Sequence, residues 1–472
     1  MKGIVYIVGS GPGDKNLITV KGAKILSQCD VVVYDYLCGE DVLEYCKDNC
    51  EKICAETFSK DHSLDRIRGL CDFIISRVRE GKKVVRLKGG DPSIFGRLHE
   101  EEKILKDNGI EYRVVPGVTA GTAAACMLGI SLTSREFAPK VAFITGHESQ
   151  DKRISFIDWE KISSRETLVL YMSVERIGEI AENLMNVSKL SPDTPVLAIR
   201  NISRLDQRYI VSNLGNIQKD VIEHKITPPT IFIIGDVIRY EEQLNWYKSQ
   251  KKILFTGISE ERFFEDGIIF HLPMVRIVPL EDYSELESYI KRVANKEFDW
   301  VVFCSRYGVY YFFKTLYNLK MDTRVLSGVK IAAIGASTSN ALKNYGVIAE
   351  LVPTEESSEG LLEVFKNVPR GKIFLPRSDL SDKGLGDGFS KLGFYVEECY
   401  AYRNIMPDNL PDIDFSLIDT IIFTSPSTVR NFVRRYGYIP LDKEIRCIGP
   451  KTSRELEKYL NANPSYRHHQ SS

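Results

Sequence analysis

The sequence predicts an α/β protein in which each half of the chain forms two lobes of strands and helices. Short apolar runs, such as residues 4–8 and 84–87, have the composition of buried strands. Each such run is followed by glycine, serine or threonine where a helical pattern begins. This alternation continues along the chain, and it is typical of sheets covered by helices. In the second half the strand-and-turn units occur twice, which indicates a pair of similar lobes.

Length and composition limit the classes of protein to consider. The 472 residues exceed what one core supports, so two to four domains are expected. Hydrophobic residues make up 43% and charged residues 27%, as in ordinary soluble proteins. The net charge of −1 provides no field to attract nucleic acid, so an anion site has to be built locally. Without a signal peptide or an apolar run of about 20 residues, we expect a cytoplasmic protein with no membrane partner.

The ten cysteines show no paired spacing. Cys46, Cys50 and Cys54 recur every four residues, but no second CxxC or HxxxH motif completes a metal site. We therefore expect free thiols in a reducing compartment and no metal.

The stretch 83–101, KVVRLKGGDPSIFGRLHEE, organises the first half. Its strand pattern breaks at Gly89 and Gly90, where the backbone is free of side-chain clashes. Asp91 followed by proline predicts a helix start, with a carboxylate at the N-cap. Farther along this helix, Arg97 and Glu100 can share one face, either as part of a site or as an ordinary surface ion pair.

Two further glycine-containing turns follow strands in this half. The turn after residues 4–8 lacks the GxGxxG spacing, and Pro12 stands where a helix amide would bind pyrophosphate, so we expect no nicotinamide cofactor. The turn 116–120 opens a helix of small residues, which permits the close approach of a flat ligand or of another helix. A second series of alternating strand and helix patterns begins after about residue 150. We therefore expect two lobes with a cleft between them.

Residues 1–245 resemble the uroporphyrinogen-III C-methyltransferases. The matching stretches are VGSGPGDKNLIT, VVYDYL, RLKGGDPSIFGR, PGVTAGTAA, GISLTSR, TGH, LYM and PPTIFIIGDVI. The resemblance implies the two-lobed tetrapyrrole methyltransferase fold, a homodimer formed through this half, and S-adenosyl-L-methionine bound in the cleft mainly by backbone groups. The implied cofactor contacts are Pro12, Gly89, Gly90, Asp91, Thr119, Ala120, Met172 and Thr230.

The methyl acceptor in this family is a tetrapyrrole that carries many carboxylates. We assign Arg97 to one of these carboxylates, because a guanidinium can bind it through two hydrogen bonds. Glu100 would orient Arg97 or assist proton loss from the methylated ring. The chain departs from the family pattern at two places. Leu98 and His99 follow Arg97 where small residues are usual, and Ile202 stands in place of a glycine.

The second half begins after residues 241–251, EEQLNWYKSQK, whose polar composition predicts a linker. Strand patterns then end repeatedly in serine, threonine or glycine at helix starts. Hydroxyls and free amides at the carboxyl edge of a sheet suit carboxylate binding, although each hydroxyl alone could be an N-cap. The paired segments are 252–256 with 372–376, 301–305 with 421–425, and 331–338 with 445–452.

Residues 252–462 resemble uroporphyrinogen-III synthases. The matching stretches are FDWVVFCSRYGVYYF, KIAAIGASTSNAL, GKIFLPRSD, VEECYAYRN, IIFTSPSTV and IRCIGPKTSREL. The resemblance implies a two-lobed α/β synthase with parallel sheets, one lobe from about 252–277 plus 404–465 and the other from about 278–403. Its reaction closes hydroxymethylbilane with inversion of ring D and uses no cofactor. Tyr402 matches the position closest to an acid, and the substrate-facing positions are Ser305, Thr338, Ser425 and Thr452.

Together the two resemblances predict a bifunctional enzyme that converts hydroxymethylbilane, through uroporphyrinogen III, into precorrin-2 for siroheme or cobalamin. Apart from a second copy of the chain, its partners would be small tetrapyrrole substrates, with no nucleic acid and no membrane. Two alternatives stay open at this point. The first half could methylate a later precorrin, and the second half could be a regulatory module that binds a tetrapyrrole without turnover.

Overall fold

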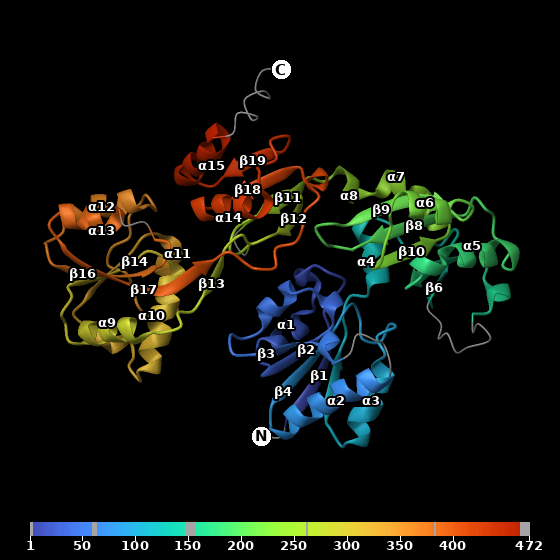
Figure 1. Ribbon diagram of the computed structural model, residues 1–472, viewed down its shortest axis with the longest axis horizontal. Helices are drawn as coiled ribbons and strands as arrows, with labels where there is room; N and C mark the ends of the chain where they lie inside the picture. Colours follow the sequence, from blue (N-terminus) through green and yellow to red (C-terminus); the bar gives the residue numbers. More distant parts are fainter. Residues whose placement is uncertain (1–2, 59–63, 147–156, 261–262, 382–383, 463–472) are drawn as a thin grey trace. The chain divides into compact units, whose positions relative to one another are not determined.

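The computed structural model describes residues 3–58, 64–146, 157–260, 263–381 and 384–462 (Figure 1). The chain divides into two compact units. One comprises residues 1–251 and 266–270, and the other comprises residues 252–265 and 271–472. His147, in the TGH motif, lies outside the described residues.

The first unit begins with a parallel sheet in the order β3-β2-β4-β1-β5. Its central strands are buried on both faces, as expected when helices cover both sides, and their buried residues are apolar except for Arg86 and Lys88 of β4. The strands are β1 (Ile4–Gly9), β2 (Val31–Tyr34), β3 (Glu51–Cys54), β4 (Lys83–Lys88) and β5 (Tyr112–Val115), and the helices are α1 (Val20–Leu26), α2 (Leu64–Arg79) and α3 (Leu98–Asp107). Gly9 pairs with Lys88 and Val8 with Val115, so the turns after β1, β4 and β5 leave the sheet at the same edge.

The second sheet of this unit is mixed, in the order β6-β7-β10-β8-β9, because β10 runs antiparallel to both of its neighbours. Its strands are β6 (Lys140–Thr145), β7 (Glu166–Tyr171), β8 (Pro195–Arg200), β9 (Arg208–Asn213) and β10 (Thr230–Ile234), with helices α4 (Ala120–Met127), α5 (Ile177–Asn186) and α6 (Ile217–Glu223). A Cβ at Gly121 would lie 2.6 Å from Val169 Cγ1, and Ala123 is buried in the same core. The small residues of α4 therefore serve close packing of this helix against β7.

The segment expected to be a linker is folded. It forms α7 (Glu241–Leu244) and α8 (Trp246–Ser249), and Tyr247 is buried. Trp246 Nε1 donates to the carbonyl oxygen of Cys126 at 2.8 Å, and Asn245 Nδ2 donates to the Tyr209 hydroxyl at 2.9 Å. The prediction of a linker was wrong because a few aromatic and amide side chains are enough to fasten a mostly polar segment.

Two further sheets are formed mainly by the second unit. The first has the order β12-β11-β18-β19, and residues 268–270 of its edge strand β12 are counted with the first unit. Its strands are β11 (Lys252–Phe255), β12 (Ile268–His271), β18 (Thr420–Phe423) and β19 (Glu444–Cys447), followed by α14 (Pro426–Tyr436) and α15 (Pro450–Ala462) after β18 and β19. Strand β11 pairs in parallel with β18, and β18 with β19.

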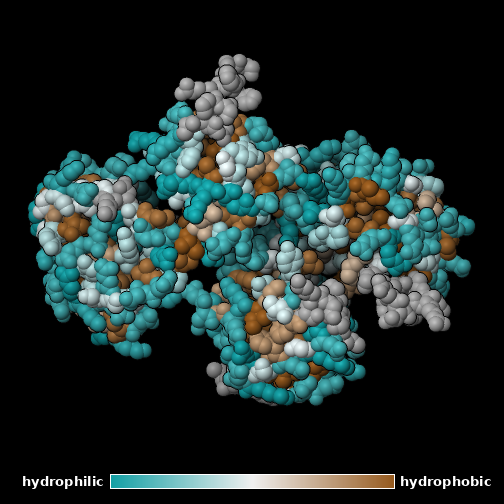
Figure 2. Space-filling model, viewed as in Figure 1, coloured by the Kyte–Doolittle hydropathy of each residue, from teal (hydrophilic) through white to brown (hydrophobic). Residues whose placement is uncertain are grey.

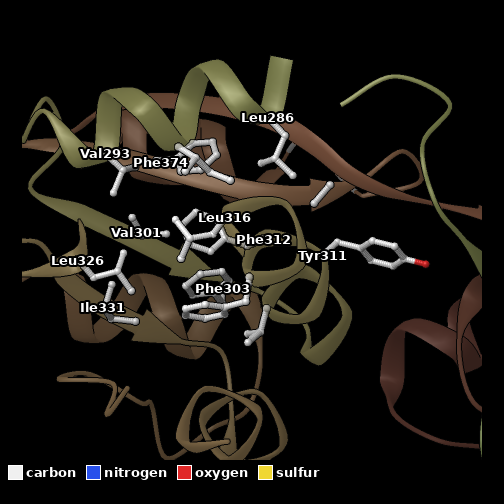
Figure 3. Packing of buried hydrophobic residues seen from close by; sticks show 14 of the residues in the cluster. Leu286, Val293, Val301, Phe303, Tyr311, Phe312, Leu316, Leu326, Ile331 and Phe374 are labelled. Atoms are coloured by element: carbon white, nitrogen blue, oxygen red, sulfur yellow. The ribbon is translucent and has the colours of Figure 1, made fainter. Parts of the chain in front are cut away.

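The other sheet has the order β13-β17-β16-β14-β15, with only its edge strand β13 antiparallel to its neighbour. Its strands are β13 (Arg276–Val278), β14 (Trp300–Phe303), β15 (Lys330–Ala333), β16 (Lys372–Ser378) and β17 (Tyr395–Ile405), and its helices are α9 (Ser284–Ala294), α10 (Arg306–Asn318), α11 (Ala336–Lys343), α12 (Ser358–Phe365) and α13 (Gly384–Lys391). Figure 3 shows the core on one face, where Leu286 of α9 and Phe312 of α10 meet Phe374 and Phe303 of the strands, while the Tyr311 hydroxyl points away.

The α/β class with mainly parallel sheets is confirmed by these arrangements. The face of the molecule in Figure 2 is largely hydrophilic, with hydrophobic residues in separate patches. Within the described ranges, we find no helix with the length and apolar composition needed to cross a membrane.

Candidate functional site

Three turns meet at the carboxyl edge of the first sheet. Gly11 and Gly90 form an antiparallel bridge, in which Gly90 N–H donates to the Gly11 carbonyl oxygen at 2.8 Å. Gly90 has φ +66°, and a Cβ built on it would lie 3.7 Å from Ala120 N and 3.9 Å from Thr119 Cα. The turns that contain Pro12, Gly90 and Ala120 are therefore neighbours, as the resemblance implied when it assigned all three residues to one cofactor.

Asp91 joins two of these turns. Its Oδ1 accepts a hydrogen bond from Ser93 N at 2.8 Å, and its Oδ2 accepts one from Gly117 N at 2.9 Å. Asp91 does not start a helix, so that prediction was wrong: helix α3 begins at Leu98. The local turn formed through Ser93 competes with the helix, and Arg97, with φ +54°, lies in the left-handed region that helices exclude.

Tyr171, at the end of β7, positions the start of α4. Its hydroxyl lies 2.7 Å from Thr119 Oγ1 and accepts a hydrogen bond from Gly121 N at 2.8 Å. Burial raises the pKa of Tyr171 despite these two hydrogen bonds, so the hydroxyl stays protonated at neutral pH. The ring centroid of Phe95 lies 5.1 Å from that of Tyr171. The motif LYM contains this tyrosine, but the sequence interpretation assigned only its methionine.

Met172 directly follows β7, and Thr230 begins the adjacent strand β10 of the second sheet. Phe232 pairs with Leu170, so the antiparallel register, continued by two residues, places Thr230 opposite Met172. Met172 is 54% exposed and has φ +51°. Thr230 is buried, and its hydroxyl donates to the Thr227 carbonyl oxygen at 2.7 Å. A direct contact from Thr230 would therefore use its backbone.

The turn after β8 reaches the first glycine turn. Ser203 Oγ accepts a hydrogen bond from Asp14 N at 2.9 Å, and a Cβ at Gly13 would lie 2.6 Å from the Ile202 carbonyl oxygen. The Ile202 side chain is buried. A glycine at position 13 is required for this close approach of the two turns, whereas the larger side chain of Ile202 is accommodated inside the second lobe.

Residues with positive φ concentrate around these turns. Phe95, Met172 and Asn201 adopt the left-handed region, as do Arg97 and Ser203. The other described non-glycine residues with positive φ are lysines within three residues of the end of a helix, where this conformation is an ordinary way to end a helix: Lys189, Lys225, Lys296 and Lys320. Left-handed residues away from helix ends are typical of functional sites.

Arg97 and Glu100 form the expected ion pair, with Arg97 Nε 3.2 Å from Glu100 Oε1. Both side chains are slightly more than one third exposed. Arg97 is the residue directly before α3, and Glu100 lies in the first turn of that helix. The pair is thus available to a ligand outside the sheet edge, and it is also what an ordinary surface pair looks like.

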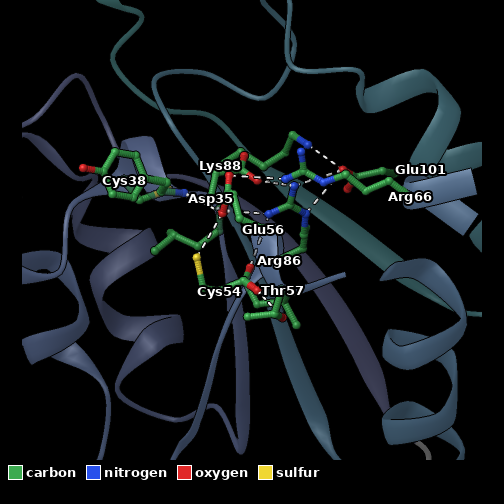
Figure 4. A network of polar contacts seen from close by, with 12 residues as sticks. Asp35, Cys38, Cys54, Glu56, Thr57, Arg66, Arg86, Lys88 and Glu101 are labelled. Carbon is green, nitrogen blue, oxygen red and sulfur yellow. Dashed lines mark hydrogen bonds and ion pairs between the residues drawn. The ribbon is translucent and has the colours of Figure 1, made fainter. Parts of the chain in front are cut away.

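The sequence interpretation missed a buried ion network around Arg86 and Lys88, at the end of β4 (Figure 4). Arg86 Nη2 lies 2.6 Å from Asp35 Oδ1 and 3.3 Å from Glu101 Oε1, and Lys88 Nζ lies 2.5 Å from the same Glu101 oxygen. Burial acts to raise the pKa of Asp35, but the charges of Arg86 and Lys88 hold it below its usual range. The network fastens the end of β4 to α3, immediately before Gly89.

The turns fit S-adenosylmethionine in their chemistry. Their surface is mainly backbone and small residues, because Gly89, Gly90 and Ala120 carry little or no side chain. A Cβ at Gly90 would take up the space in front of the Thr119–Ala120 backbone. Peptide groups at this edge can pair with the polar groups of a nucleoside and an amino acid, and the exposed Met172 side chain adds an apolar contact.

In the second unit, Ser305 and Tyr402 lie together. Ser305 Oγ lies 2.8 Å from the Tyr402 hydroxyl and accepts a hydrogen bond from Gly308 N at 2.9 Å, which caps α10. The Tyr402 ring stacks on Tyr311, with centroids 5.8 Å apart. Burial raises the pKa of Tyr402, although Ser305 and Ser378 oppose the shift. Tyr402 is therefore a neutral hydroxyl that can donate a proton or a hydrogen bond.

The other three positions also lie at helix starts. Ser425 caps α14 in a capping box with Thr428, and Thr452 Oγ1 donates to the Ile448 carbonyl oxygen at 2.9 Å. Thr338 is buried in the first turn of α11. Strands β14 and β15 pair, which puts Ser305 and Thr338 at one sheet edge, and β18 pairs with β19, which does the same for Ser425 and Thr452. Capping occupies the serine hydroxyls, so backbone amides are the better candidates for ligand contacts.

Comparison with known proteins gives a consistent result for each half. Residues 4–218 match the family model of tetrapyrrole (corrin/porphyrin) methylases, and residues 265–463 match that of uroporphyrinogen-III synthase HemD. A porphyrin biosynthesis protein HemD from Ruminiclostridium josui is 31% identical over 97% of this chain and 94% of its own length. A uroporphyrinogen-III C-methyltransferase from Bacillus subtilis (strain 168) is 34% identical over 74% of this chain and 73% of its own.

A third relative bears on the cofactor. It is an S-adenosyl-L-methionine-dependent uroporphyrinogen III methyltransferase from Methanosarcina barkeri, 41% identical over 51% of this chain and 94% of its own length. The chain thus belongs to the family of porphyrin biosynthesis protein HemD, with an S-adenosylmethionine-dependent tetrapyrrole methyltransferase in its first half and a uroporphyrinogen-III synthase in its second.

Proposed function

We propose that the two halves catalyse consecutive steps in the cytoplasm. The second half closes hydroxymethylbilane to uroporphyrinogen III, and the first half methylates this product at C2 and C7 to give precorrin-2 for siroheme or cobalamin. The observation that carries the proposal is the presence of both family models in one chain. The product named by the synthase model is the substrate named for the methyltransferase relatives, so the two activities form a sequence.

In the first half, the chain's own residues hold and orient the reactants. The cofactor, when bound, supplies an electrophilic methyl group. The turns around Gly90, Asp91 and Thr119 would hold it through backbone groups, and Tyr171 keeps the start of α4 in place through its two hydrogen bonds. Positioning and exclusion of water would then supply most of the acceleration, since the attacking pyrrole carbon is already electron-rich.

Arg97 is the proposed contact for a tetrapyrrole carboxylate. Its guanidinium is partly exposed and is oriented by Glu100 at 3.2 Å. Held in this way, it can offer two parallel N–H donors to an incoming carboxylate, as an ammonium cannot. Glu100 either keeps this orientation or receives the proton that leaves the methylated ring.

In the second half, Tyr402 is the proposed proton or hydrogen-bond donor to the leaving hydroxyl of hydroxymethylbilane. Its raised pKa keeps it protonated, and Ser305 fixes the direction of its hydroxyl. The helix starts at Ser305, Thr338, Ser425 and Thr452 would bind substrate carboxylates through backbone amides.

Order of addition tests the proposal. Full-length protein given hydroxymethylbilane alone should accumulate uroporphyrinogen III instead of the type I isomer that forms spontaneously. Later addition of S-adenosylmethionine should convert that pool to a dimethylated product, measured by mass spectrometry. Accumulation of type I material, or a type III pool that stays unmethylated, would contradict the proposed sequence.

We further propose that the protein is a homodimer through its first half, whose exposed apolar residues include Val211 on β9 and Ile222 on α6. Sedimentation of the full-length chain should give twice the chain mass, whereas charged residues at these two positions should give monomers.

A further inference from the structure

Three cysteines converge at the edge of the first sheet opposite the cofactor turns. Cys29, Cys46 and Cys50 have Sγ atoms that all lie within 4.8 Å of one another. The Cys29 and Cys50 sulfurs are 3.4 Å apart. Cys29 comes just before β2 and Cys50 just before β3, and these two strands are parallel, so both cysteines lie at the amino edge. The cofactor turns, by contrast, leave the carboxyl ends of β1, β4 and β5.

The local backbone holds the three sulfurs close together. Glu51 N–H donates to the Asp30 carbonyl oxygen at 2.9 Å, which places Cys50 beside Cys29. Lys47 Nζ lies 2.6 Å from Asp30 Oδ1, which ties the residue after Cys46 to the residue after Cys29. A turn in which Cys50 N–H donates to the Lys47 carbonyl oxygen at 3.0 Å brings Cys46 back toward Cys50. Three separate contacts therefore fix the cluster.

We propose that Cys29, Cys46 and Cys50 bind one soft, thiophilic metal ion, of the class of Zn²⁺ or Cu⁺. Three thiolates bound to zinc at about 2.3 Å have sulfurs about 3.8 Å apart. Here the Cys29 and Cys50 sulfurs are 3.4 Å apart and no sulfur lies more than 4.8 Å from another, so small shifts reach that geometry. Thiolates select this class of ion over Mg²⁺ or Ca²⁺. Lys47 and Lys52 supply positive charge beside Cys50, which offsets the excess negative charge of three thiolates.

The ion would have a structural role. Residues 35–50 connect β2 to β3 and contain only the two short 3₁₀ helices η2 (Tyr36–Cys38) and η3 (Asp41–Tyr45). Cys46 and Cys50 lie at the end of this connection, and Cys29 lies in the body of the lobe. A metal bound by all three would fasten the connection to the sheet. The competing explanation is that three small apolar side chains simply pack in the core, since Cys29 and Cys50 are buried there.

Metal titration of the full-length protein separates these explanations. Protein stripped with a chelator under reducing conditions is titrated with Co²⁺, and we expect a thiolate-to-cobalt charge-transfer band that saturates at one ion per chain. Displacement of this band by Zn²⁺ or by Cu⁺ identifies the preferred ion. Cys46→Ser is the main variant because Cys46 is the least buried of the three. Loss of an outer partner alone weakens metal sites by about 10- to 100-fold, so loss of a thiolate should weaken Co²⁺ binding by at least that factor.

Two matched controls complete the test. Cys54→Ser removes the cysteine that continues the four-residue spacing but lies outside the cluster, and Cys71→Ser removes a buried cysteine from another part of the core. Both should bind Co²⁺ like the natural protein. Calorimetry with S-adenosylhomocysteine shows whether each variant is folded. The proposal is overturned if the natural protein holds no ion as purified and gives no charge-transfer band after stripping and Co²⁺ addition, or if a Cys29–Cys50 disulfide forms in place of the metal site.

Discussion

Replacing Glu101 with glutamine tests whether the buried ion network holds the cofactor turns in place. Glu101 Oε1 lies 2.5 Å from Lys88 Nζ and 3.3 Å from Arg86 Nη2, and the Glu101 side chain is 4% exposed. Glutamine has nearly the same shape but no charge. Arg86 would keep its contact with Asp35 at 2.6 Å, whereas Lys88 would lose the carboxylate with which it pairs in the described part of the chain.

The expected loss of stability follows from the burial of these charges. Removing one partner of a buried pair typically destabilises a protein by about 3–5 kcal/mol, because the remaining charge stays without compensation. The adjacent residue provides a matched control. Glu100 pairs with Arg97 at 3.2 Å on the surface, where side chains more than one third exposed contribute about 0.2–1 kcal/mol. Glu101→Gln should therefore destabilise the lobe several times more than Glu100→Gln.

Hydrogen exchange followed by mass spectrometry measures this difference in the full-length protein. Peptides that cover β4 and α3 report the free energy of local opening, which a whole-chain melting curve of two units would not resolve. We expect faster exchange in both elements in Glu101→Gln, together with weaker binding of S-adenosylhomocysteine. Equal protection in the Glu101→Gln and Glu100→Gln variants would refute the reasoning.

Four further predictions concern the two sites. Asp91→Ala leaves the Ser93 and Gly117 amides without their acceptor, so it should destabilise the turns by about 1–3 kcal/mol and weaken S-adenosylhomocysteine binding. Unchanged affinity by calorimetry would reduce Asp91 to a structural role. Arg97→Leu should slow methylation by about 100-fold while sparing cofactor binding, and Arg97→Lys should rescue it only in part; near-normal turnover in either removes Arg97 from the site. Tyr402→Phe should slow formation of uroporphyrinogen III by about 100-fold without affecting methylation of supplied uroporphyrinogen III. Equal losses of the cyclisation and methylation activities would point to misfolding. Fragments 1–251 and 252–472 should each fold, and mixing them should restore conversion of hydroxymethylbilane; failure on mixing would indicate that the halves must be joined.

The sequence predicted the strands well because their signals are local. Runs such as residues 4–8 are apolar enough to be buried on both faces, and the glycines after them indicate turns. The proximity of the turns that contain Pro12, Gly90 and Ala120 was implied only by the family resemblance, which assigns all three residues to one cofactor. The pairing of β1 with β4 and β5 gives the physical reason, since parallel strands bring their carboxyl ends to one edge.

Contacts between distant residues were not accessible to this reasoning. The spacing of cysteines singled out Cys54 with Cys46 and Cys50, but the pairing of β2 with β3 brings Cys29 to them instead. Likewise, nothing local indicates that Glu101 of α3 meets Lys88 of β4. The helix start at Asp91 failed for a different reason. Its two carboxylate oxygens accept from Ser93 N and from Gly117 N, and the left-handed backbone at Arg97 delays the helix to Leu98.

The most direct test of the proposed reaction sequence is the structure of the product made by the full-length chain from hydroxymethylbilane and S-adenosylmethionine labelled with carbon-13 in its methyl group. Nuclear magnetic resonance should show two labelled methyl groups, at C2 and C7, on a macrocycle with the type III order of side chains. A single methyl group, methyl groups at other carbons, or a type I macrocycle would contradict the account.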